Sequence, residues 1–149
     1  MHLPETPFST GPEASNSAVK AELDELMRTF LGAFTNTGGR RADVDAVRDV
    51  FIPQGMIIAN VGTEPVIYDL DTFIEPRQRI LGDGTLTEFS EWEVAERTEI
   101  AGSVAHRFSE YRKSGVRNGE PFEGTGWKTT QFVRTPAGWK ISSMAWYDD

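Results

Sequence analysis

The chain contains no cysteine, so disulfide bonds, thiolate nucleophiles and cysteine metal ligands are all excluded. Only two histidines occur, His2 and His106, whereas a structural zinc site draws on three or four Cys or His ligands. No calcium-binding loop of alternating Asp and Asn is present either. We therefore expect the protein to use neither a metal nor another cofactor.

Basic residues and long apolar runs are also scarce. Fifteen Lys and Arg stand against 23 Asp and Glu, and the resulting net charge of −8 repels a phosphate backbone. No apolar run approaches the roughly 18 residues that span a membrane, and the first residues lack the pattern of a signal peptide. These features favour a cytoplasmic protein that binds neither nucleic acid nor a membrane.

The apolar residues that are present suffice for one domain. The 149 residues are 38% hydrophobic and 11% aromatic, which is ample for a single core. Residues 1–16 hold three prolines and show no apolar periodicity, which predicts a mobile tail. The domain itself is expected to cover residues 17–149.

A long helix is predicted at the start of this domain. Ser17 is suited to cap it, and Thr37-Gly38-Gly39 is suited to end it. Between them, apolar residues recur at the spacing of one helix face: Val19, Leu23, Leu26, Met27, Phe30, Leu31 and Phe34.

Two shorter helices are predicted over residues 43–51 and 69–81. Pro76 lies so far inside the second that we expect a kink or a restarted turn there. Between the two helices, residues 56–61 and 65–68 form short apolar runs that can pair as a hairpin.

From Leu86 onward the apolar period becomes that of a strand. Four strands are predicted, over residues 86–98, 104–112, 125–134 and 139–147, with a long loop at residues 113–124. Helices followed by an antiparallel meander are typical of an α+β domain. We expect a curved antiparallel sheet that wraps the long helix, with all helices on one face.

The turns suggest which side chains face inward. If residues 99–103 form the first loop, His106 lies opposite Glu96 on the face that carries most of the bulky apolar groups. We assign that face to the core. In the last hairpin, apolar groups occur on both faces, so a second subunit is expected to cover the outer one. The sequence thus predicts a homodimer through the face of Trp127, Met144 and Trp146.

Three segments resemble the SnoaL-like bacterial proteins of the nuclear transport factor 2-like superfamily. They are His106–Tyr111 (HRFSEY), Gly126–Val133 (GWKTTQFV) and Trp139–Tyr147 (WKISSMAWY), and the resemblance covers about residues 18–149. It implies a cone-shaped half-barrel with a pocket at its open end, and frequent dimers. The superfamily includes ketosteroid isomerases, polyketide cyclases, dehydratases and proteins without a demonstrated reaction. The isomerase pattern has no clear match here, so no catalytic residue is carried over.

The candidate catalytic residues are His106 and Glu96. On the inward face, Glu96 can orient the His106 ring, whose other nitrogen then moves a proton in the pocket. Alternatively, His106 is a core or rim histidine satisfied by Glu96 or by a backbone carbonyl. Glu110 is either a second carboxylate of the pocket or a charged strand end.

Further candidates concern the lining of the pocket. Lys128 is either a cationic anchor at the pocket mouth or an ordinary surface lysine. The bulky residues expected on the inward face either line a ligand site or simply pack the core, and they are Trp92, Phe108, Phe132 and Trp139.

Two functions from different classes follow. The first is a non-catalytic pocket protein that binds a small, largely apolar molecule or acts as an association module. The second is an acid–base enzyme of the isomerase, dehydratase or polyketide-cyclase kind that uses His106 with Glu96. A purely structural domain would show a filled barrel without a cavity.

Overall fold

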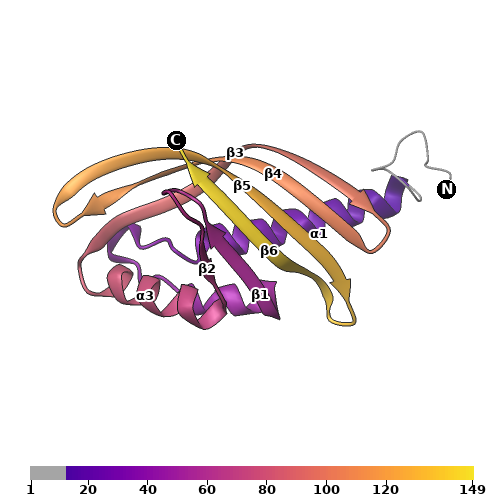
Figure 1. Ribbon diagram of the computed structural model, residues 1–149, viewed down its shortest axis with the longest axis horizontal. Coiled ribbons are helices and arrows are strands. Elements are labelled where there is room, and N and C mark those ends of the chain that lie inside the picture. Colours follow the sequence, from indigo (N-terminus) through magenta and orange to yellow (C-terminus); the bar gives the residue numbers. More distant parts are fainter. Residues whose placement is uncertain (1–12) are drawn as a thin grey trace.

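A curved six-stranded sheet with helices on one side makes up the molecule (Figure 1). The computed structural model describes residues 13–149, with side chains from Asn16 onward. The elements in chain order are α1 (Glu13–Gly32), η1 (Thr37–Gly39), η2 (Val44–Ala46), α2 (Val47–Val50), β1 (Phe51–Ala59), β2 (Val66–Tyr68), α3 (Leu70–Gly82), β3 (Leu86–Ala101), β4 (Val104–Arg117), β5 (Glu120–Thr135) and β6 (Gly138–Asp148). The fold class is the predicted α+β arrangement.

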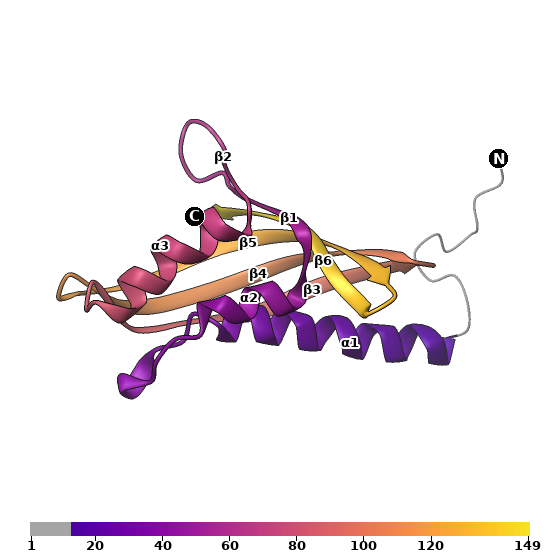
Figure 2. The same ribbon diagram turned by 90° about the horizontal axis from the view of Figure 1, so that it is seen from below.

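Helix α1 presents the predicted apolar face to the sheet. Leu23, Met27 and Phe30 are almost completely buried, and the helix lies on the same side of the sheet as α3 (Figure 2). The helix begins at Glu13, earlier than the predicted cap at Ser17. The end of the predicted tail is therefore helical, and the rest of that tail lies outside the described residues.

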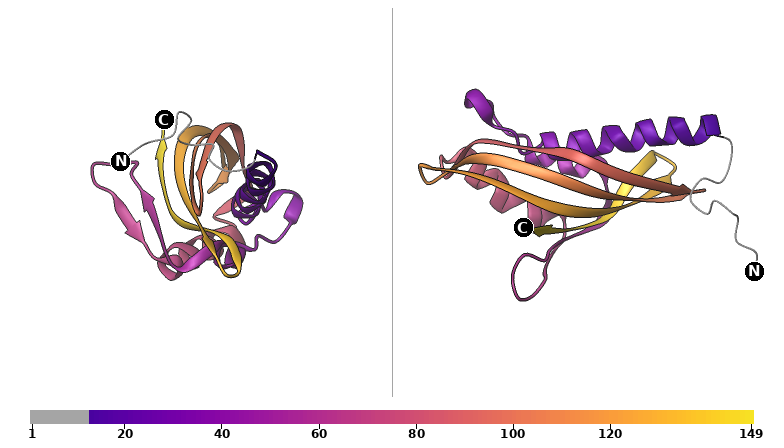
Figure 3. Two further views of the ribbon diagram at one scale, coloured as in Figure 1. Left: turned by 90° about the vertical axis from the view of Figure 1, so that its right-hand side faces the viewer. Right: turned by 90° about the horizontal axis from the view of Figure 1, so that it is seen from above.

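Helix α3 closes the open side of the sheet, as the end-on view in Figure 3 shows. Its first turn is fixed by a capping box, because Asp69 Oδ1 accepts from the Thr72 backbone N–H at 2.8 Å and Thr72 Oγ1 accepts from the Asp69 N–H at 3.0 Å. Of the two possibilities predicted at Pro76, a restarted turn is wrong, since α3 continues through this residue to Gly82, and a kink stays a prediction. Phe73 and Ile74 are buried on the preceding turn, and their packing outweighs the loss of one backbone hydrogen bond.

The sheet follows the order β2-β1-β6-β5-β4-β3 and is mixed rather than wholly antiparallel. Strands β1 and β2 pair as the predicted hairpin, with Ile58 opposite Ile67, but β1 lies parallel to β6. The predicted loop of residues 113–124 is also wrong. Strands β4 and β5 run on to a tight turn at Asn118-Gly119, where both residues have positive φ, of 51° and 82°.

The register predicted for the β3–β4 hairpin is wrong. The turn is the pair Gly102-Ser103, so Ala101 lies opposite Val104, and His106 lies opposite Glu99. The predicted register differs from this one by an odd number of residues, which exchanges the two faces of a strand. On β4 the inward residues are therefore Arg107, Ser109 and Tyr111.

In the last hairpin the predicted register holds for only half of its length. Phe132 lies opposite Ile141 as predicted, but a bulge follows and Gln131 lies opposite Ser143. The extra residue turns Met144 inward, where it is 1% exposed. Of the residues predicted for the dimer face, Trp127 alone remains outside, because Trp146 also turns inward with Met144.

A polar cluster joins α1 to the sheet beyond the aromatic core. Arg107 is 4% exposed, and its guanidinium donates to Asp24 at 2.6 Å and to Glu93 at 2.6 and 3.0 Å. Burial opposes the charge on Asp24, but the hydrogen bonds from Lys20 and Arg107 outweigh it and lower the pKa of that carboxyl. Burial acts likewise on Glu96, whose pKa is lowered by the hydrogen bonds from Thr98 and Lys20.

Replacing Arg107 with Met should destabilise the fold by about 3 kcal/mol at neutral pH, because the carboxylates around it lose their buried cation. A carboxyl with a lowered pKa stabilises the fold above its ordinary pKa, and this contribution is lost as the pH falls through the folded value. Urea denaturation at neutral pH and at about pH 3 should therefore show a smaller difference between wild type and variant in acid.

The matched control for this prediction is Arg28→Met. Arg28 pairs with Glu25 at 2.6 Å, but both side chains are about two-thirds exposed, at 67% and 66%. This change should alter stability by no more than about 0.5 kcal/mol. Equal effects of the two substitutions would show that the Arg107 cluster does not stabilise the fold.

Candidate functional site

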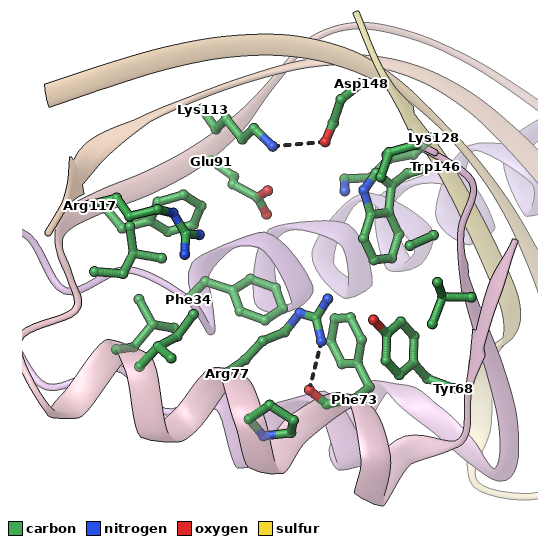
Figure 4. Close-up of a pocket in the computed structure, with 18 of the residues that line it drawn as sticks. Phe34, Tyr68, Phe73, Arg77, Glu91, Lys113, Arg117, Lys128, Trp146 and Asp148 are labelled. Atoms are coloured by element: carbon green, nitrogen blue, oxygen red, sulfur yellow. Dashed lines mark hydrogen bonds and ion pairs between the residues drawn. The ribbon is translucent and has the colours of Figure 1, made fainter. Parts of the chain in front are cut away.

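A cavity of about 450 Å³ lies between α3, the end of α1 and the inner face of the sheet (Figure 4). This volume is in the range of small-molecule sites. Most of the wall is apolar and much of it is aromatic, including Phe34, Tyr68, Phe73, Phe89, Phe122 and Trp146. The barrel is thus filled at one end and hollow at the other.

Lys128 of β5 projects into this cavity although its side chain is only 4% exposed. Its Nζ lies 4.0 Å from the centre of the Tyr111 ring and 5.2 Å from that of Trp146. Within residues 13–149, no carboxylate lies within 4 Å of this Nζ. The side chain is therefore a buried cation that contacts rings in place of a counter-ion.

Burial is the main influence on the charge of Lys128. Desolvation lowers the pKa of the ammonium group, and repulsion from Lys113 and Arg77 lowers it further, against attraction from Glu91 and Asp148. Attraction to the rings contributes about 0.5 to 2 kcal/mol, whereas removing an unpaired ammonium from water costs several kcal/mol. The fold therefore keeps Lys128 in the cavity at a net cost in stability.

Arg77 of α3 supplies a second cation on the opposite wall. Its guanidinium carbon lies 4.0 Å from the centre of the Phe73 ring and 5.7 Å from that of Trp146. Nη1 donates to the Phe73 carbonyl at 3.1 Å, which fixes the orientation of the group. No carboxylate in the described part of the chain pairs with Arg77, so its remaining N–H donors are available to a ligand.

The sheet side of the cavity carries a hydrogen-bonded group of residues. Tyr111 donates its hydroxyl proton to Asp148 Oδ1, and Lys113 Nζ lies 3.0 Å from Asp148 Oδ2. Burial and the bond to Asp148 raise the pKa of Tyr111, so its phenol stays protonated. Glu91 lines the same wall, and Figure 4 shows its carboxylate pointing into the cavity.

Gly126 allows this wall to form. A side-chain carbon at residue 126 would lie 2.4 Å from the Tyr147 carbonyl oxygen and 2.7 Å from the Tyr111 ring. Only glycine leaves room for that ring beside β5, two residues before Lys128. This geometry explains the glycine in the segment GWKTTQFV.

The charge of the cavity is opposite to that of the whole protein. Its lining holds the cations Arg77, Lys113, Arg117 and Lys128 and the anions Glu91 and Asp148, which leaves an excess of two positive charges in a chain of net charge −8. An aromatic wall with an excess of cations, of which Lys128 is buried and Arg117 is exposed, suits a ligand that combines an apolar body with an anionic group.

Solved structures of other proteins superpose on the chain over nearly all of its length. A nuclear transport factor 2-like superfamily protein from Salmonella enterica is 20% identical, with a TM-score of 0.73, and the match covers 88% of this chain and 91% of that one. This chain has the nuclear transport factor 2-like fold. No protein-family model and no curated protein sequence matches it.

Two more structures show how widely this nuclear transport factor 2-like fold is shared. The Kfla4162 protein from Kribbella flavida is 17% identical, with a TM-score of 0.75 over 90% of this chain and 93% of that one. Hexachlorocyclohexane dehydrochlorinase LinA-type3 from Novosphingobium barchaimii is 10% identical, with a TM-score of 0.72 over 93% and 91%. At these identities the likeness concerns the fold alone.

The two predicted catalytic residues do not meet in this fold. His106 faces outward, with 53% of its side chain exposed, and its Nε2 lies 2.6 Å from Glu99 Oε1. Glu96 faces inward and interacts with Thr98 and Lys20 at 2.5 and 2.9 Å. The reason is that the turn between β3 and β4 was predicted at the wrong residues. The prediction therefore paired His106 with Glu96, whereas His106 lies opposite Glu99.

The predicted pocket residues are also divided between two faces. Lys128 lines the cavity, whereas Trp92 and Phe108 lie outside, 43% and 49% exposed. Glu110 lies on the outer face of β4, opposite Trp127. Phe132 belongs to the core, and with His106 it borders a shallow hollow of about 270 Å³ away from the cavity.

Sequence reasoning missed Arg77, Glu91, Tyr111 and Asp148. Arg77 carried a usable signal, because it follows Phe73 by four residues and so interrupts the apolar stripe of a predicted helix. The other three gave no such signal, since their side of the strand depends on bulges and on the true hairpin register.

The described residues show no group of three or more His, Asp and Glu arranged to hold a metal ion. None of the helices in residues 13–149 combines the length and the apolar character needed to cross a bilayer.

Replacing Lys128 with Met should raise the free energy of unfolding by about 1 to 2 kcal/mol at neutral pH, because an unpaired buried amine is removed. A lysine with a lowered folded pKa costs stability below that pKa. The cost shrinks as the pH rises toward 10.5, the ordinary value, so the advantage of the variant should shrink in alkali. Urea denaturation at about pH 7 and pH 10 measures both effects.

Lys113→Met serves as the matched control. This lysine also lines the cavity but pairs with Asp148, so its removal should not stabilise the protein. A Lys128→Met variant with a lower free energy of unfolding than the wild type would contradict the conclusion that buried Lys128 destabilises the fold.

Proposed function

We propose that this protein binds a small molecule with a largely apolar, ring-containing body and one carboxylate. The observation that carries the proposal is the pair of cations, Arg77 and Lys128, that face an aromatic cavity while no carboxylate in residues 13–149 pairs with either. A ligand carboxylate supplies the missing negative charge, and the aromatic rings of the cavity contact the apolar body of the ligand.

The size of the cavity and the shared fold agree with this ligand class. About 450 Å³ accommodates a bicyclic aromatic compound. The dehydrochlorinase with the same fold is named for hexachlorocyclohexane, which is a ring compound. The acid–base pair predicted from the sequence, His106 with Glu96, lies apart and outside the cavity lining, so it does not support a reaction in the cavity.

Two compounds of the same shape, one with and one without a carboxylate, test whether the site prefers this group. In isothermal titration calorimetry, 2-naphthoate should bind about tenfold or more tightly than 2-naphthamide, which has the same shape without the charge. Arg77→Met should reduce the preference for the carboxylate, because one of the two cations is lost, while leaving the amide's affinity unchanged.

Arg97→Met is the control for this experiment, because Arg97 lies exposed on β3 and outside the cavity lining. It should retain the preference for the carboxylate. Equal affinity of the wild type for the two compounds, or no binding of either, would overturn the proposal.

We further propose that the chain forms a homodimer through an outer face that differs from the predicted one. Phe108 and Trp127 stack at 5.2 Å between ring centres, and Tyr147 lies opposite Trp127 on β6. These three rings are 49%, 36% and 54% exposed and form an aromatic strip across three strands. Burial of such a strip against a second copy removes apolar surface from water.

Sedimentation velocity tests the dimer. The wild type should sediment as a dimer, and Phe108→Glu should shift it to a monomer because two carboxylates would be buried in the interface. Ile67→Glu, on the exposed strand β2 at 63% exposure, should remain a dimer. A wild type that is monomeric at all concentrations would refute this interface.

A further inference from the structure

Lys128 differs from every other lysine of the chain in its partners. Lys20 pairs with Asp24 and Glu96, Lys113 pairs with Asp148, and Lys140 donates to the Asp49 carbonyl at 2.6 Å. Lys128 has ring contacts only, although its Nζ borders a cavity large enough for a ligand. No oxygen acceptor in the described residues receives a hydrogen bond from its Nζ.

The surroundings of Lys128 make its ammonium group easier to deprotonate than that of an exposed lysine. Desolvation comes first, and the nearby cations Lys113 and Arg77 add to it, so the pKa of the amine is lowered despite Glu91 and Asp148. Tyr111, which packs against Nζ, is a protonated phenol and carries no charge. A lysine whose pKa is lowered can attract an anionic ligand as an ammonium group and reaches its neutral, nucleophilic form at a lower pH than an exposed lysine.

Glu91 provides a proton-transfer group in the same cavity. Its carboxylate makes no hydrogen bond or ion pair with the described residues, and Figure 4 shows it pointing into the space that Lys128 and Arg77 border. A carboxylate that is not committed to a structural partner can take up and return a proton during a reaction.

Resting on the ligand site proposed above, we propose that the ligand is an aromatic oxo acid and that Lys128 forms an imine with its carbonyl carbon. Arg77 binds the carboxylate and so fixes the carbonyl near Nζ. The lone pair of Nζ forms a bond to the carbonyl carbon, and the carbonyl oxygen takes a proton, which gives a carbinolamine. The hydroxyl then leaves as water with a second proton, and a C=N bond remains.

All protons that this step needs come from groups in the site. The two protons that the oxygen gains come from the amine nitrogen, and Glu91 carries them from nitrogen to oxygen. One water is released, and nothing is oxidised or reduced. The product is an electron-withdrawing iminium when protonated, which activates the adjacent carbon for acid–base chemistry.

Reductive trapping tests the imine on the full chain. The protein is incubated with 6-formyl-2-naphthoate and sodium cyanoborohydride, which reduces imines to stable secondary amines, and peptide mapping by mass spectrometry locates the label. Lys128 should be labelled first, and its labelling rate should reach half-maximum at a lower pH than that of Lys20 or Lys140.

Four variants test whether the trapped label results from the proposed reaction of Lys128. Lys128→Met should lose the fast label, and Lys140→Met, which removes a lysine outside the cavity lining, should keep it. Arg77→Met should require about tenfold more probe for the same rate. Glu91→Gln should slow labelling by on the order of a hundredfold while 2-naphthoate binds as before.

The outcomes separate this inference from the function on which it rests. Binding of 2-naphthoate without fast labelling of Lys128 overturns the imine and leaves the carboxylate site intact. Absence of 2-naphthoate binding overturns both. Lys128→Met must still bind 2-naphthamide, which shows that the loss of label reflects the missing amine and not a collapsed cavity.

Discussion

The bulges in β3 and β6 are the constraint on which the rest of the structure depends. Each bulge inserts one residue into a strand and so reverses which side chains face the concave side. Because of them, Glu91 and Glu96 of β3 face inward together, as do Ile141 and Trp146 of β6. Without them, strict alternation would place Glu91 or Trp146 on the outer face, and the cavity would lose its polar wall.

Buried charges have carboxylate partners at one end of the half-barrel and lack them at the other. At one end Arg107 is enclosed by Asp24 and Glu93, so every charge there has a partner and the cluster stabilises the fold. At the other end Lys128 and Arg77 lack carboxylate partners among the described residues and face an open space. Unpaired charge costs stability, and among the described residues it is concentrated at the cavity, where the proposed ligand would bind.

Lys128 connects the packing of the fold to its chemistry. The aromatic rings that enclose it give the cavity its affinity for an apolar body, and the same rings exclude the water that would hold the ammonium charged. Arg77 reinforces the effect, since it repels the ammonium and attracts an anion. Under the proposed function, one arrangement of side chains would bind a carboxylate ligand and also lower the pKa of the amine that reacts with it.

The sequence by itself determined the fold class, the apolar face of α1, the β1–β2 hairpin and the pairing of Phe132 with Ile141, because local periodicity and turn residues specify these features. It offered Lys128 as either a cation at the pocket mouth or a surface lysine, and did not decide between them. Only the tertiary structure decided that His106 and Phe108 face outward and that Arg77, Glu91 and Trp146 surround Lys128. The side on which a strand residue lies depends on the position of a bulge and on the exact turn. Both are set by pairing with neighbouring strands and by packing against α1 and α3, which local sequence does not encode.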